Sequence, residues 1–434
     1  MDVATTLPQT LSTDSGIMDA LVIQGGGPLR GRVAISGAKN AALPVMAATL
    51  LASGVHRLRN VPQLLDTRTF GNVLETLGAK VTFAPGECVI DTTGVHSVEA
   101  PYDLVRTMRA SIYVLGPLLA RFGAARVSLP GGCAWGPRPV NLHLQGLQAM
   151  NAQLEIDHGY IVGKDVKLRG AAFNFDVVSV GATAQLMMAA TLAEGTTVLE
   201  NVAIEPDITV LGEVLTACGA RIEGLGSRRV TIHGVRSLAP IDTAIIADRI
   251  EAATFAAAAA ITGGTITLER VVPDHFEASL RKLEEAGCSI VRGVDEVTVT
   301  GPSRPRAADV TTMPFPGFPT DMQAQMMAVA SIATGTSVIT DTIYLDRFTH
   351  VPELGRMGAD IELKTNSAVV KGVTKLSGAP VMATDLRASA ALALAALVAE
   401  GETKISRIYH LDRGYERFDA KLTALGAQVE RIRE

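Results

Sequence analysis

The stretch IEAATFAAAAAITGGTITL, residues 250–268, is the clearest copy of a pattern that occurs six times in this 434-residue chain. Each copy is a run of small apolar residues that leads through a glycine into a short β-forming segment. The other five copies begin at Asn40, Arg109, Gly181, Asp321 and Arg387. The six glycines follow one another at intervals of 66 to 72 residues, at Gly54, Gly123, Gly195, Gly264, Gly335 and Gly401. Such regular self-similarity predicts a repeated supersecondary unit.

A second mark follows each of these glycines after 23 to 28 residues. It reads LGAKV, MNAQL, CGARI, AGCSI, MGADI and LGAQV, with its central position at Gly78, Asn151, Gly219, Gly287, Gly358 and Gly426. Both marks are typical of a helix that ends at a residue of positive φ, usually Gly or Asn, and runs on into a strand. We therefore expect six α/β units, each with a helix, a strand, an amphipathic helix and further strands.

The first helix of each unit is apolar on nearly every face, which is typical of a helix that is buried on all sides. The simplest arrangement places three such helices inside each of two similar domains, with sheets and amphipathic helices outside. An even split of the six units puts the boundary near residues 240–247, where the segment SLAPIDTAII begins like a loop.

The composition excludes several classes of protein. Hydrophobic residues make up 47% of the chain and charged residues 19%, with a net charge of -5, so neither disorder nor a nucleic-acid partner is expected. The chain has no CxxC pair, no metal-ligand spacing among its histidines, and neither a dinucleotide-binding nor a P-loop glycine motif. His350 and His410 are interpreted as core or supporting residues.

The N-terminus and the hydropathy pattern favour a cytoplasmic protein. Residues 1–17 have neither the basic nor the apolar region of a signal peptide and are expected to be a flexible extension. No apolar run reaches the roughly 20 residues that a membrane span needs. Four widely spaced cysteines fit a reducing compartment. We therefore expect no membrane partner.

Charged residues interrupt the repeat at the N-terminal edges of the buried helices, where free backbone N–H groups and the helix dipole favour anions. Cations stand there at Lys39, Arg109 and Arg387, and carboxylates at Asp248 and Asp385. Helix capping is an alternative role for the two aspartates. Capping cannot explain the three cations, because a positive charge at a helix N-terminus is unfavourable unless an anion compensates it. Positions that break a repeat are candidates for function.

Residues 130–139, PGGCAWGPRP, predict an articulated loop, because closely spaced Gly and Pro forbid regular structure. The loop contains Cys133, with Arg138 nearby. A thiol close to cations can act as an acid or a nucleophile; the alternative is an inert cysteine in a surface turn. The other three cysteines, which are interpreted as packing residues, are Cys88, Cys218 and Cys288.

Two further arginines follow the strands that succeed buried helices, and so are expected on one side of their domain. They are Arg347 in LDRFTHVPEL and Arg413 in YHLDRGYERF. Arginine binds planar carboxylates and phosphates through two parallel hydrogen bonds. The alternative for either residue is a surface ion pair. Together with Lys39, they favour a compact site for a small dianion.

The motifs, taken together, resemble those of one known family. The chain contains SGAKNAALP, TMRAS, PGGCAWGPRPVNLH, VSVGAT, FPTDMQAQ, RFTHVPELGRMGA, ATDLRAS and RIYHLDRGYER. These are similar to motifs of the UDP-N-acetylglucosamine 1-carboxyvinyltransferases, which are enolpyruvyl transferases. The resemblance runs from about residue 18 to the C-terminus.

The resemblance implies an inverse α/β barrel fold of two similar domains with the active site in the cleft between them. Residues 18–38 plus 247–434 would form the domain that holds both termini, and residues 39–246 the domain with the cysteine loop. The implied reaction transfers the enolpyruvyl group of phosphoenolpyruvate to the 3′-hydroxyl of UDP-N-acetylglucosamine and releases phosphate. It is the first committed step of peptidoglycan precursor synthesis. The two substrates are the implied partners, and no cofactor is implied.

The resemblance also implies roles for individual residues. Cys133 would be the proton donor and Asp321 the candidate base, with Lys39 and Arg413 also in the catalytic set. The residues implied on phosphoenolpyruvate are Lys39, Asn40, Arg138 and Arg413. Those implied on the sugar nucleotide are Arg109, Arg138, Pro139, Val140, Asn141, Leu142, Ser179, Val180, Gly181, Asp321 and Ile343. Those implied at the cleft or in its closure are Arg347, Asp385 and Arg387.

Three residues depart from the family's usual pattern and remove charge near the nucleotide side and the cleft rim. Asn141 replaces an aspartate, while Val177 and Leu65 replace lysines. Two rival functions remain open: a shikimate-3-phosphate enolpyruvyl transferase, which shares the fold but lacks the cysteine loop, and a non-catalytic regulatory paralogue that binds the sugar nucleotide.

The role of Cys133 gives a first prediction. Cys133→Ser is expected to lose most activity, because an alcohol is a far weaker acid than a thiol, whereas Cys133→Asp retains much more. Activity is measured as phosphate release, and intact mass is measured after treatment with the epoxide fosfomycin, the alkylating agent that the resemblance implies. Full activity of the serine variant, or label on one of the other three cysteines, would remove Cys133 from the mechanism.

Overall fold

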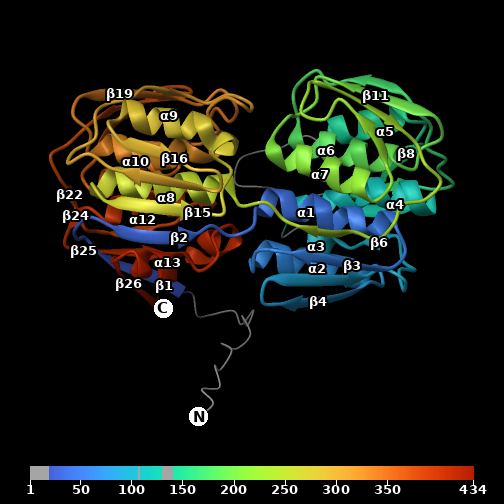
Figure 1. Ribbon diagram of the computed structural model, residues 1–434, viewed down its shortest axis with the longest axis horizontal. Helices are drawn as coiled ribbons and strands as arrows, with labels where there is room; N and C mark the ends of the chain where they lie inside the picture. Colours follow the sequence, from blue (N-terminus) through green and yellow to red (C-terminus); the bar gives the residue numbers. More distant parts are fainter. Residues whose placement is uncertain (1–18, 106–107, 130–139) are drawn as a thin grey trace, which may run out of the picture.

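The computed structural model describes residues 19–105, 108–129 and 140–434. Figure 1 shows two lobes side by side, each with helices enclosed by sheets. Each lobe has its own hydrophobic core: one is built from buried residues within 21–35 and 250–425, and the other from buried residues within 38–245.

Six four-stranded sheets have the same arrangement of strands. In each sheet one edge strand pairs in parallel with its neighbour, and the remaining pairs are antiparallel. Around the core of residues 38–245, the sheets in strand order are β14 (Asp242–Ala244), β3 (Val55–Arg59), β5 (Glu87–Asp91), β4 (Lys80–Ala84); β6 (Glu99–Ala100), β7 (Ala125–Ser128), β9 (Tyr160–Gly163), β8 (Leu154–Asp157); and β10 (Ala172–Asn174), β11 (Thr196–Glu200), β13 (Arg229–His233), β12 (Arg221–Glu223).

The other core is surrounded in the same way. Its sheets are β16 (Ser289–Arg292), β17 (Glu296–Thr300), β15 (Thr265–Glu269), β2 (Arg30–Ala34); β18 (Val310–Thr311), β19 (Thr336–Thr340), β21 (Ser367–Lys371), β20 (Asp360–Leu363); and β23 (Pro380–Met382), β25 (Glu402–Ser406), β1 (Asp19–Gln24), β26 (Gln428–Arg433). A two-stranded sheet pairs β22 (Leu376–Ser377) with β24 (Ala399–Glu400).

Three inner helices occupy each core. They are α1 (Lys39–Ala48), α4 (Leu115–Phe122) and α6 (Val180–Ala190) in one lobe, and α8 (Arg249–Thr262), α10 (Gln323–Ser331) and α12 (Leu386–Ala396) in the other. Every residue of α8 from Ile250 to Ile261 is buried. Alanine-rich faces allow this because small side chains let helices and sheets approach closely on all sides. The prediction of six units around buried helices is confirmed.

The remaining helices lie outside the inner ones or join them to strands. The outer helices are α2 (Leu65–Thr76), α5 (Asn141–Ala149), α7 (Pro206–Ala217), α9 (Glu277–Glu285), α11 (Val351–Arg356) and α13 (Phe418–Ala424). The short connecting helices are α3 (Tyr102–Val105), η1 (Thr49–Leu51), η2 (Arg109–Val114), η3 (Pro273–Phe276), η4 (Thr320–Met322) and η5 (Ile408–Arg413).

The glycine marks are confirmed in part. All six residues of the second mark have positive φ, including Asn151 at 70°. The first mark needs two corrections. In the fourth unit the residue of positive φ is Gly263, at 64°, and not Gly264. In addition, four glycines of the first mark lie three to five residues after the preceding helix ends and form turns into strands, so they are not helix-capping glycines: Gly54, Gly195, Gly335 and Gly401. Gly263 and these four turn glycines all have positive φ, which favours glycine.

The chain crosses between the lobes twice, and the two crossing segments pair with each other. Gly37 and Ala247 form an antiparallel bridge. The N–H of Ala38 donates to the Ile246 carbonyl at 2.7 Å, and the N–H of Asp248 donates to the Ser36 carbonyl at 2.8 Å. The two links therefore form one short ribbon, which restricts how the lobes move relative to each other.

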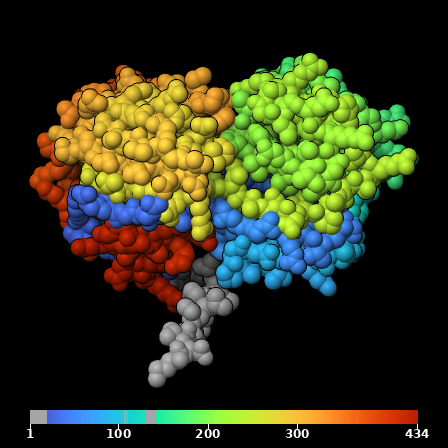
Figure 2. All heavy atoms as spheres, viewed as in Figure 1, coloured from blue at the N-terminus to red at the C-terminus, as the bar shows by residue number. Residues whose placement is uncertain are grey.

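Side chains add further contacts between the lobes, and Figure 2 shows the two lobes meeting along a seam. Arg249 Nε lies 3.6 Å from Asp207 Oδ2. Arg228 Nη2 donates to the Phe315 carbonyl at 3.4 Å. Phe315 belongs to the segment that leads into η4, so one of these contacts lies a few residues from Asp321.

The crossing ribbon gives a prediction about stability. A Cβ at Gly37 would lie 1.8 Å from the Asn60 carbonyl oxygen, so Gly37→Ala must displace the backbone. We expect a loss of about 1–3 kcal/mol in the free energy of unfolding. Gly27→Ala is the matched control, because a Cβ there meets nothing within 4 Å. Chemical denaturation measures both variants, and equal stability of the two would contradict the packing of the ribbon.

Candidate active site

The first cluster of charge joins the two lobes through a buried carboxylate. Lys39 begins α1, Asp66 lies in the first turn of α2, and Arg413 ends η5. Lys39 Nζ donates to Asp66 Oδ2 at 3.1 Å, and Arg413 Nε donates to Asp66 Oδ1 at 2.9 Å. The side chain of Asp66 is 7% exposed and that of Lys39 12%. Two cations from different lobes thus hold one carboxylate between them.

The electrostatics of Asp66 follow from this arrangement. Burial by itself raises the pKa of a carboxyl group. Here the charges of Lys39 and Arg413 and their hydrogen bonds outweigh burial, so the pKa of Asp66 lies below its ordinary value. The N-terminus of α1 has no side-chain cap and no acidic residue in its first turn. The carboxylate that compensates Lys39 is therefore supplied by α2.

The second cluster lies in the other lobe, around Asp321 in η4. Arg347 Nη1 donates to Asp321 Oδ1 at 2.7 Å, and Arg387 Nη2 donates to Asp321 Oδ2 at 2.8 Å. Burial alone would raise the pKa of Asp321, but Arg387 and Arg347 hold it well below its ordinary value. Asp321 is therefore ionised, and each of its oxygens already accepts a hydrogen bond from an arginine.

The backbone around the second cluster is held by one buried aspartate. Asp341 Oδ1 accepts hydrogen bonds from the N–H groups of Ile343 and Tyr344, both at 2.9 Å. Its Oδ2 accepts from Thr320 Oγ1 at 2.6 Å. Asp341 thus fixes both the segment of Ile343 and the residue before Asp321.

The two clusters are connected through the segment that follows Arg413. A Cβ at Gly414 would lie 2.7 Å from Leu386 Cδ1, so Gly414 packs on the first residue of α12. The ring of Tyr415 lies 5.4 Å from the Arg387 guanidinium carbon. The segment that follows Arg413 therefore packs against the start of α12, which carries Arg387.

Six of the residues predicted on the sugar nucleotide lie at a third place, whereas Asp321 and Ile343 lie in the other lobe. Asn141 and Leu142 begin α5, and Val180 and Gly181 begin α6. Gly181 approaches α5 closely, because a Cβ there would lie 3.3 Å from the His143 ring. Ser179 caps α6 and accepts from the Ala182 N–H at 3.2 Å. Val140 directly precedes α5, so the two predicted segments lie together.

Both aspartates for which capping was an alternative are helix caps. Asp248 accepts from the N–H groups of Ile250 at 2.8 Å and Glu251 at 3.1 Å. Asp385 accepts from the N–H groups of Arg387 at 2.7 Å and Ala388 at 3.2 Å. Each side chain is buried. The helix dipole explains the positions of both carboxylates. Because Asp385 accepts from the backbone N–H of Arg387, this cap also fixes the backbone from which the Arg387 side chain extends.

Several predicted residues lie outside the described residues. These are Cys133, Arg138, Pro139 and the side chain of Arg109, whose backbone lies in η2. Asn40 is described and exposed, next to Lys39 at the start of α1. The alternatives for Cys133 therefore stay as predictions.

The remaining cysteines and His350 behave as packing residues. Cys88, Cys218 and Cys288 are buried. Burial raises the pKa of the Cys88 and Cys288 thiols to about 12, so neither is a nucleophile at neutral pH. His350 is buried too, and burial, together with nearby Arg347, lowers its pKa to about 4. It is therefore uncharged at neutral pH.

Asp66 was not singled out by the sequence analysis. Asp66 stands within QLLDTRTF, where a lone aspartate looks like an ordinary first-turn residue. Its partner Arg413 is 347 residues away in the sequence. One signal in the sequence could have indicated Asp66. Lys39 stands at the N-terminal edge of a buried helix, where a cation needs a nearby anion to compensate it.

Within the parts of the chain that the structure describes, no group of three or more His, Cys, Asp or Glu side chains is arranged to hold a metal ion. No helix in those parts has the length and apolarity of a membrane span.

Solved structures share this architecture. The enolpyruvyl transferase NikO from Streptomyces tendae superposes with a TM-score of 0.86 at 27% identity, over 96% of this chain and 99% of that one. An EPSP synthase from Acinetobacter baumannii shares the fold, with a TM-score of 0.73 at 17% identity over 96% of this chain and 100% of that one. The chain therefore has the fold of the enolpyruvyl transferases.

Sequence comparison narrows the class. The family model of EPSP synthase (3-phosphoshikimate 1-carboxyvinyltransferase) matches residues 23–422. The UDP-N-acetylglucosamine 1-carboxyvinyltransferase of Geobacter metallireducens is 56% identical, over 96% of this chain and 100% of that protein. The protein of that name from Myxococcus xanthus is 54% identical, over 95% and 99%. The chain belongs to the family of the UDP-N-acetylglucosamine 1-carboxyvinyltransferases, within the broader EPSP synthase family.

Asp66 gives a prediction about pH. Because its pKa is lower in the folded protein, its contribution to stability is fully present above the ordinary value of 3.8 and is lost as pH falls through the folded pKa. Asp66→Asn is therefore expected to cost about 2–4 kcal/mol of unfolding free energy at pH 7, and less as the pH approaches 3.

The measurement is denaturant unfolding of wild type and variant at several pH values. Glu213→Gln, on the exposed face of α7, is the control and should change little at any pH. A deficit of Asp66→Asn that grows on acidification would contradict the ion cluster.

Proposed function

We propose that the protein transfers the enolpyruvyl group of phosphoenolpyruvate to the 3′-hydroxyl of UDP-N-acetylglucosamine and releases phosphate. This is the first committed step of peptidoglycan precursor synthesis. The observation that carries the proposal is the pair of cations, Lys39 and Arg413, which converge on a carboxylate from opposite lobes. Relatives that match nearly the full length of the chain are named for this reaction. The pair of cations is already arranged to bind an oxyanion.

Lys39 and Arg413 suit the anionic end of phosphoenolpyruvate. Each is partly withdrawn from water, so its attraction for an anion is screened less than at an open surface. Lysine supplies a compact point charge and arginine a planar fork that matches a carboxylate or phosphate. In the proposed complex the substrate anion takes over the contacts now made by Asp66. Arg138 and Asn40 complete the proposed set around phosphoenolpyruvate.

The chemistry needs a proton at one end of the enol double bond and an oxygen at the other. Cys133 is proposed to protonate the methylene carbon while the sugar hydroxyl oxygen bonds to the neighbouring carbon. Phosphate then leaves with its bridging oxygen, and loss of a methyl proton restores the double bond. Fixed cations stabilise the charge that develops on the phosphate oxygens.

Asp321 is proposed as the group that receives the sugar proton. Its low pKa makes it a weak base toward a free alcohol. The hydroxyl becomes far more acidic as its oxygen bonds to the substrate carbon, so a weak base is sufficient at that moment. Arg347 and Arg387 orient the carboxylate and keep it ionised.

The sugar nucleotide is proposed to bind across the starts of α5 and α6. The proposed contacts there are Arg109, Arg138, Pro139, Val140, Asn141, Leu142, Ser179, Val180 and Gly181, with Ile343 from the other lobe. The N-terminal ends of two adjacent helices favour the negative diphosphate. Asn141 and Val177 contribute no charge at this side, so the arginines would carry the electrostatic attraction.

The two cores are proposed to be two domains, residues 18–38 plus 247–434 and residues 39–246, with the substrates between them. Asp385, Arg387 and Arg347 are then placed at the edge that closes on the substrates. We also propose that the enzyme works in the cytoplasm, with these two small molecules as partners and neither nucleic acid nor membrane.

The acceptor decides between this function and its rivals. We expect phosphate release from phosphoenolpyruvate with UDP-N-acetylglucosamine and none with shikimate 3-phosphate. Phosphate is measured continuously, with each acceptor omitted in turn as the control. Turnover with shikimate 3-phosphate alone would assign the chain to the sister activity. Tight binding of the sugar nucleotide without turnover would identify a regulatory paralogue.

A further inference from the structure

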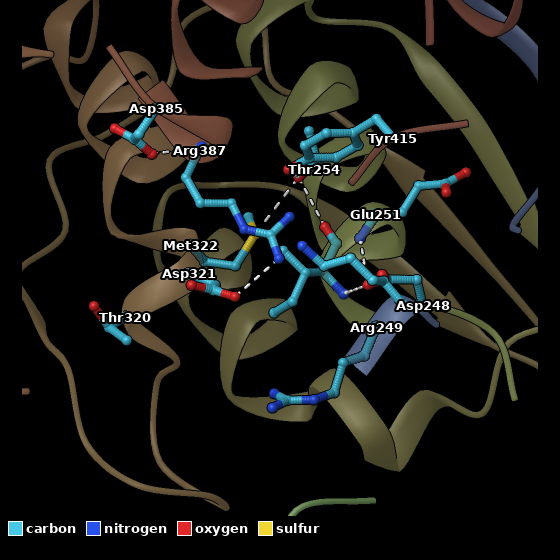
Figure 3. A network of polar contacts seen from close by, with 12 residues as sticks. Asp248, Arg249, Glu251, Thr254, Thr320, Asp321, Met322, Asp385, Arg387 and Tyr415 are labelled. Carbon is cyan, nitrogen blue, oxygen red and sulfur yellow. Dashed lines mark hydrogen bonds and ion pairs between the residues drawn. The ribbon is translucent and has the colours of Figure 1, made fainter. Parts of the chain in front are cut away.

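Tyr415 lies at the meeting point of the three inner helices of its lobe. It is 2% exposed and contacts residues from α8, α10 and α12. Its hydroxyl is 2.9 Å from Thr254 Oγ1 and 3.1 Å from Gln325 Nε2, and Gln325 Nε2 is 3.2 Å from Thr254 Oγ1. Figure 3 shows Tyr415 above Thr254, with Arg387 extending between them and Asp321.

The hydrogen-bond directions in this network follow from counting protons. Thr254 Oγ1 is 2.7 Å from the Ile250 carbonyl, which can only accept, so the threonine donates its single proton there. Thr254 is then an acceptor toward Tyr415, and the phenol donates to it. The phenol oxygen in turn accepts from Gln325. The network therefore fixes the position of the Tyr415 hydroxyl from two helices at once.

Arg387 is held by few groups for a residue so deeply buried. It is 3% exposed, and one of its nitrogens donates to Asp321. Within the described part of the chain, its Nε and Nη1 atoms have no hydrogen-bond partner. The ring of Tyr415 is the aromatic face next to its guanidinium, 5.4 Å from centroid to Cζ. Such a cation–π contact, when desolvated, is a substantial attraction.

Tyr415 also belongs to the segment that carries Arg413. Only Gly414 separates them, and Gly414 packs against Leu386, next to Arg387. The ring of Tyr415 further packs on Phe418, with centroids 5.1 Å apart. Tyr415 therefore adjoins two arginines that serve different clusters: Arg413 along the chain, and Arg387 through its ring.

We propose that Tyr415 is a positioning residue of the active site, which holds the Arg387 guanidinium against Asp321 through its hydrogen-bonded ring. The proposal rests on the proposed function, because Asp321 has its role there. Tyr415 touches no substrate in this scheme. It acts through Arg387, so the effect of removing its hydroxyl depends on whether Arg387 is present.

A double-mutant cycle tests this dependence. Tyr415→Phe is expected to lower kcat about tenfold, because loss of one buried hydrogen bond loosens the ring that positions Arg387. KM for phosphoenolpyruvate should change less than about twofold, since Lys39 and Arg413 remain. Arg387→Lys is expected to lower kcat more strongly. In the double variant, Tyr415→Phe should add little further loss, because groups that act through each other are not additive.

The control uses a tyrosine from the preceding helical turn. Tyr409 is 43% exposed and packs on His410. Tyr409→Phe should leave kcat within about twofold, and its effect should multiply with that of Arg387→Lys. Circular dichroism and thermal unfolding confirm that each variant is folded. If Tyr415→Phe does not fold, Thr254→Val removes the partner hydroxyl and carries the same cycle. Multiplicative effects of Tyr415→Phe and Arg387→Lys, or an unchanged kcat, would overturn the proposal.

A second readout does not depend on the reaction. The Nε–H resonance of Arg387 is identified by ¹⁵N NMR from its loss in Arg387→Lys. Its relaxation should show a more mobile guanidinium in Tyr415→Phe and no change in Tyr409→Phe. If wild type released no phosphate with the nucleotide sugar, the proposed function would fail while this result still supported the positioning. Unchanged mobility in Tyr415→Phe would overturn the positioning by itself.

Discussion

Burial of the repeated inner helices on nearly every side is the constraint on which the rest of this structure depends. A helix such as α8 or α12 has no solvent-facing side on which a charged residue can lie. Most of the charged groups are therefore placed at the helix ends, and the N-terminal ends carry free N–H groups. Ser179, Asp248 and Asp385 satisfy these groups as caps. Where the repeat places a cation at the same edge, the chain has to supply a carboxylate from elsewhere.

That need for compensation explains why both charge clusters have the same composition. Each consists of one carboxylate between two cations: Asp66 between Lys39 and Arg413, and Asp321 between Arg347 and Arg387. An uncompensated charge this deep would cost several kcal/mol, so these groups are placed together or not at all. The first cluster joins the lobes and the second lies within one lobe. In the proposed complex, a substrate anion would meet one cluster that changes with the arrangement of the lobes and one that does not.

Features encoded within one unit were predictable from the sequence, and features that join units were not. The positive φ of Gly78 and Asn151 follows from local backbone sterics, so it was recognisable from a few residues. In the fourth unit two adjacent glycines offered the same freedom, and the local pattern could not choose Gly263 over Gly264. The edge positions Lys39 and Arg387 were found because they break a pattern. Asp66 and Tyr415 break none, and their roles arise from partners that only the tertiary fold brings near.

The first cluster also constrains how an anion enters the site. Asp66 is tethered to α2 beside Lys39, so it competes for the cations at a high effective concentration and with no loss of translational entropy. A monoanionic ligand would exchange one charge for another and gain little. A ligand with both a carboxylate and a phosphate brings more charge and more acceptor oxygens than Asp66 offers, so its binding can exceed the tethered competitor. The internal carboxylate keeps the cations compensated in the free protein. In the proposed complex it would also raise the selectivity of the site for multiply charged anions. Because Arg413 comes from the opposite lobe, the proposed exchange would also replace an internal link between the lobes by one that passes through the ligand.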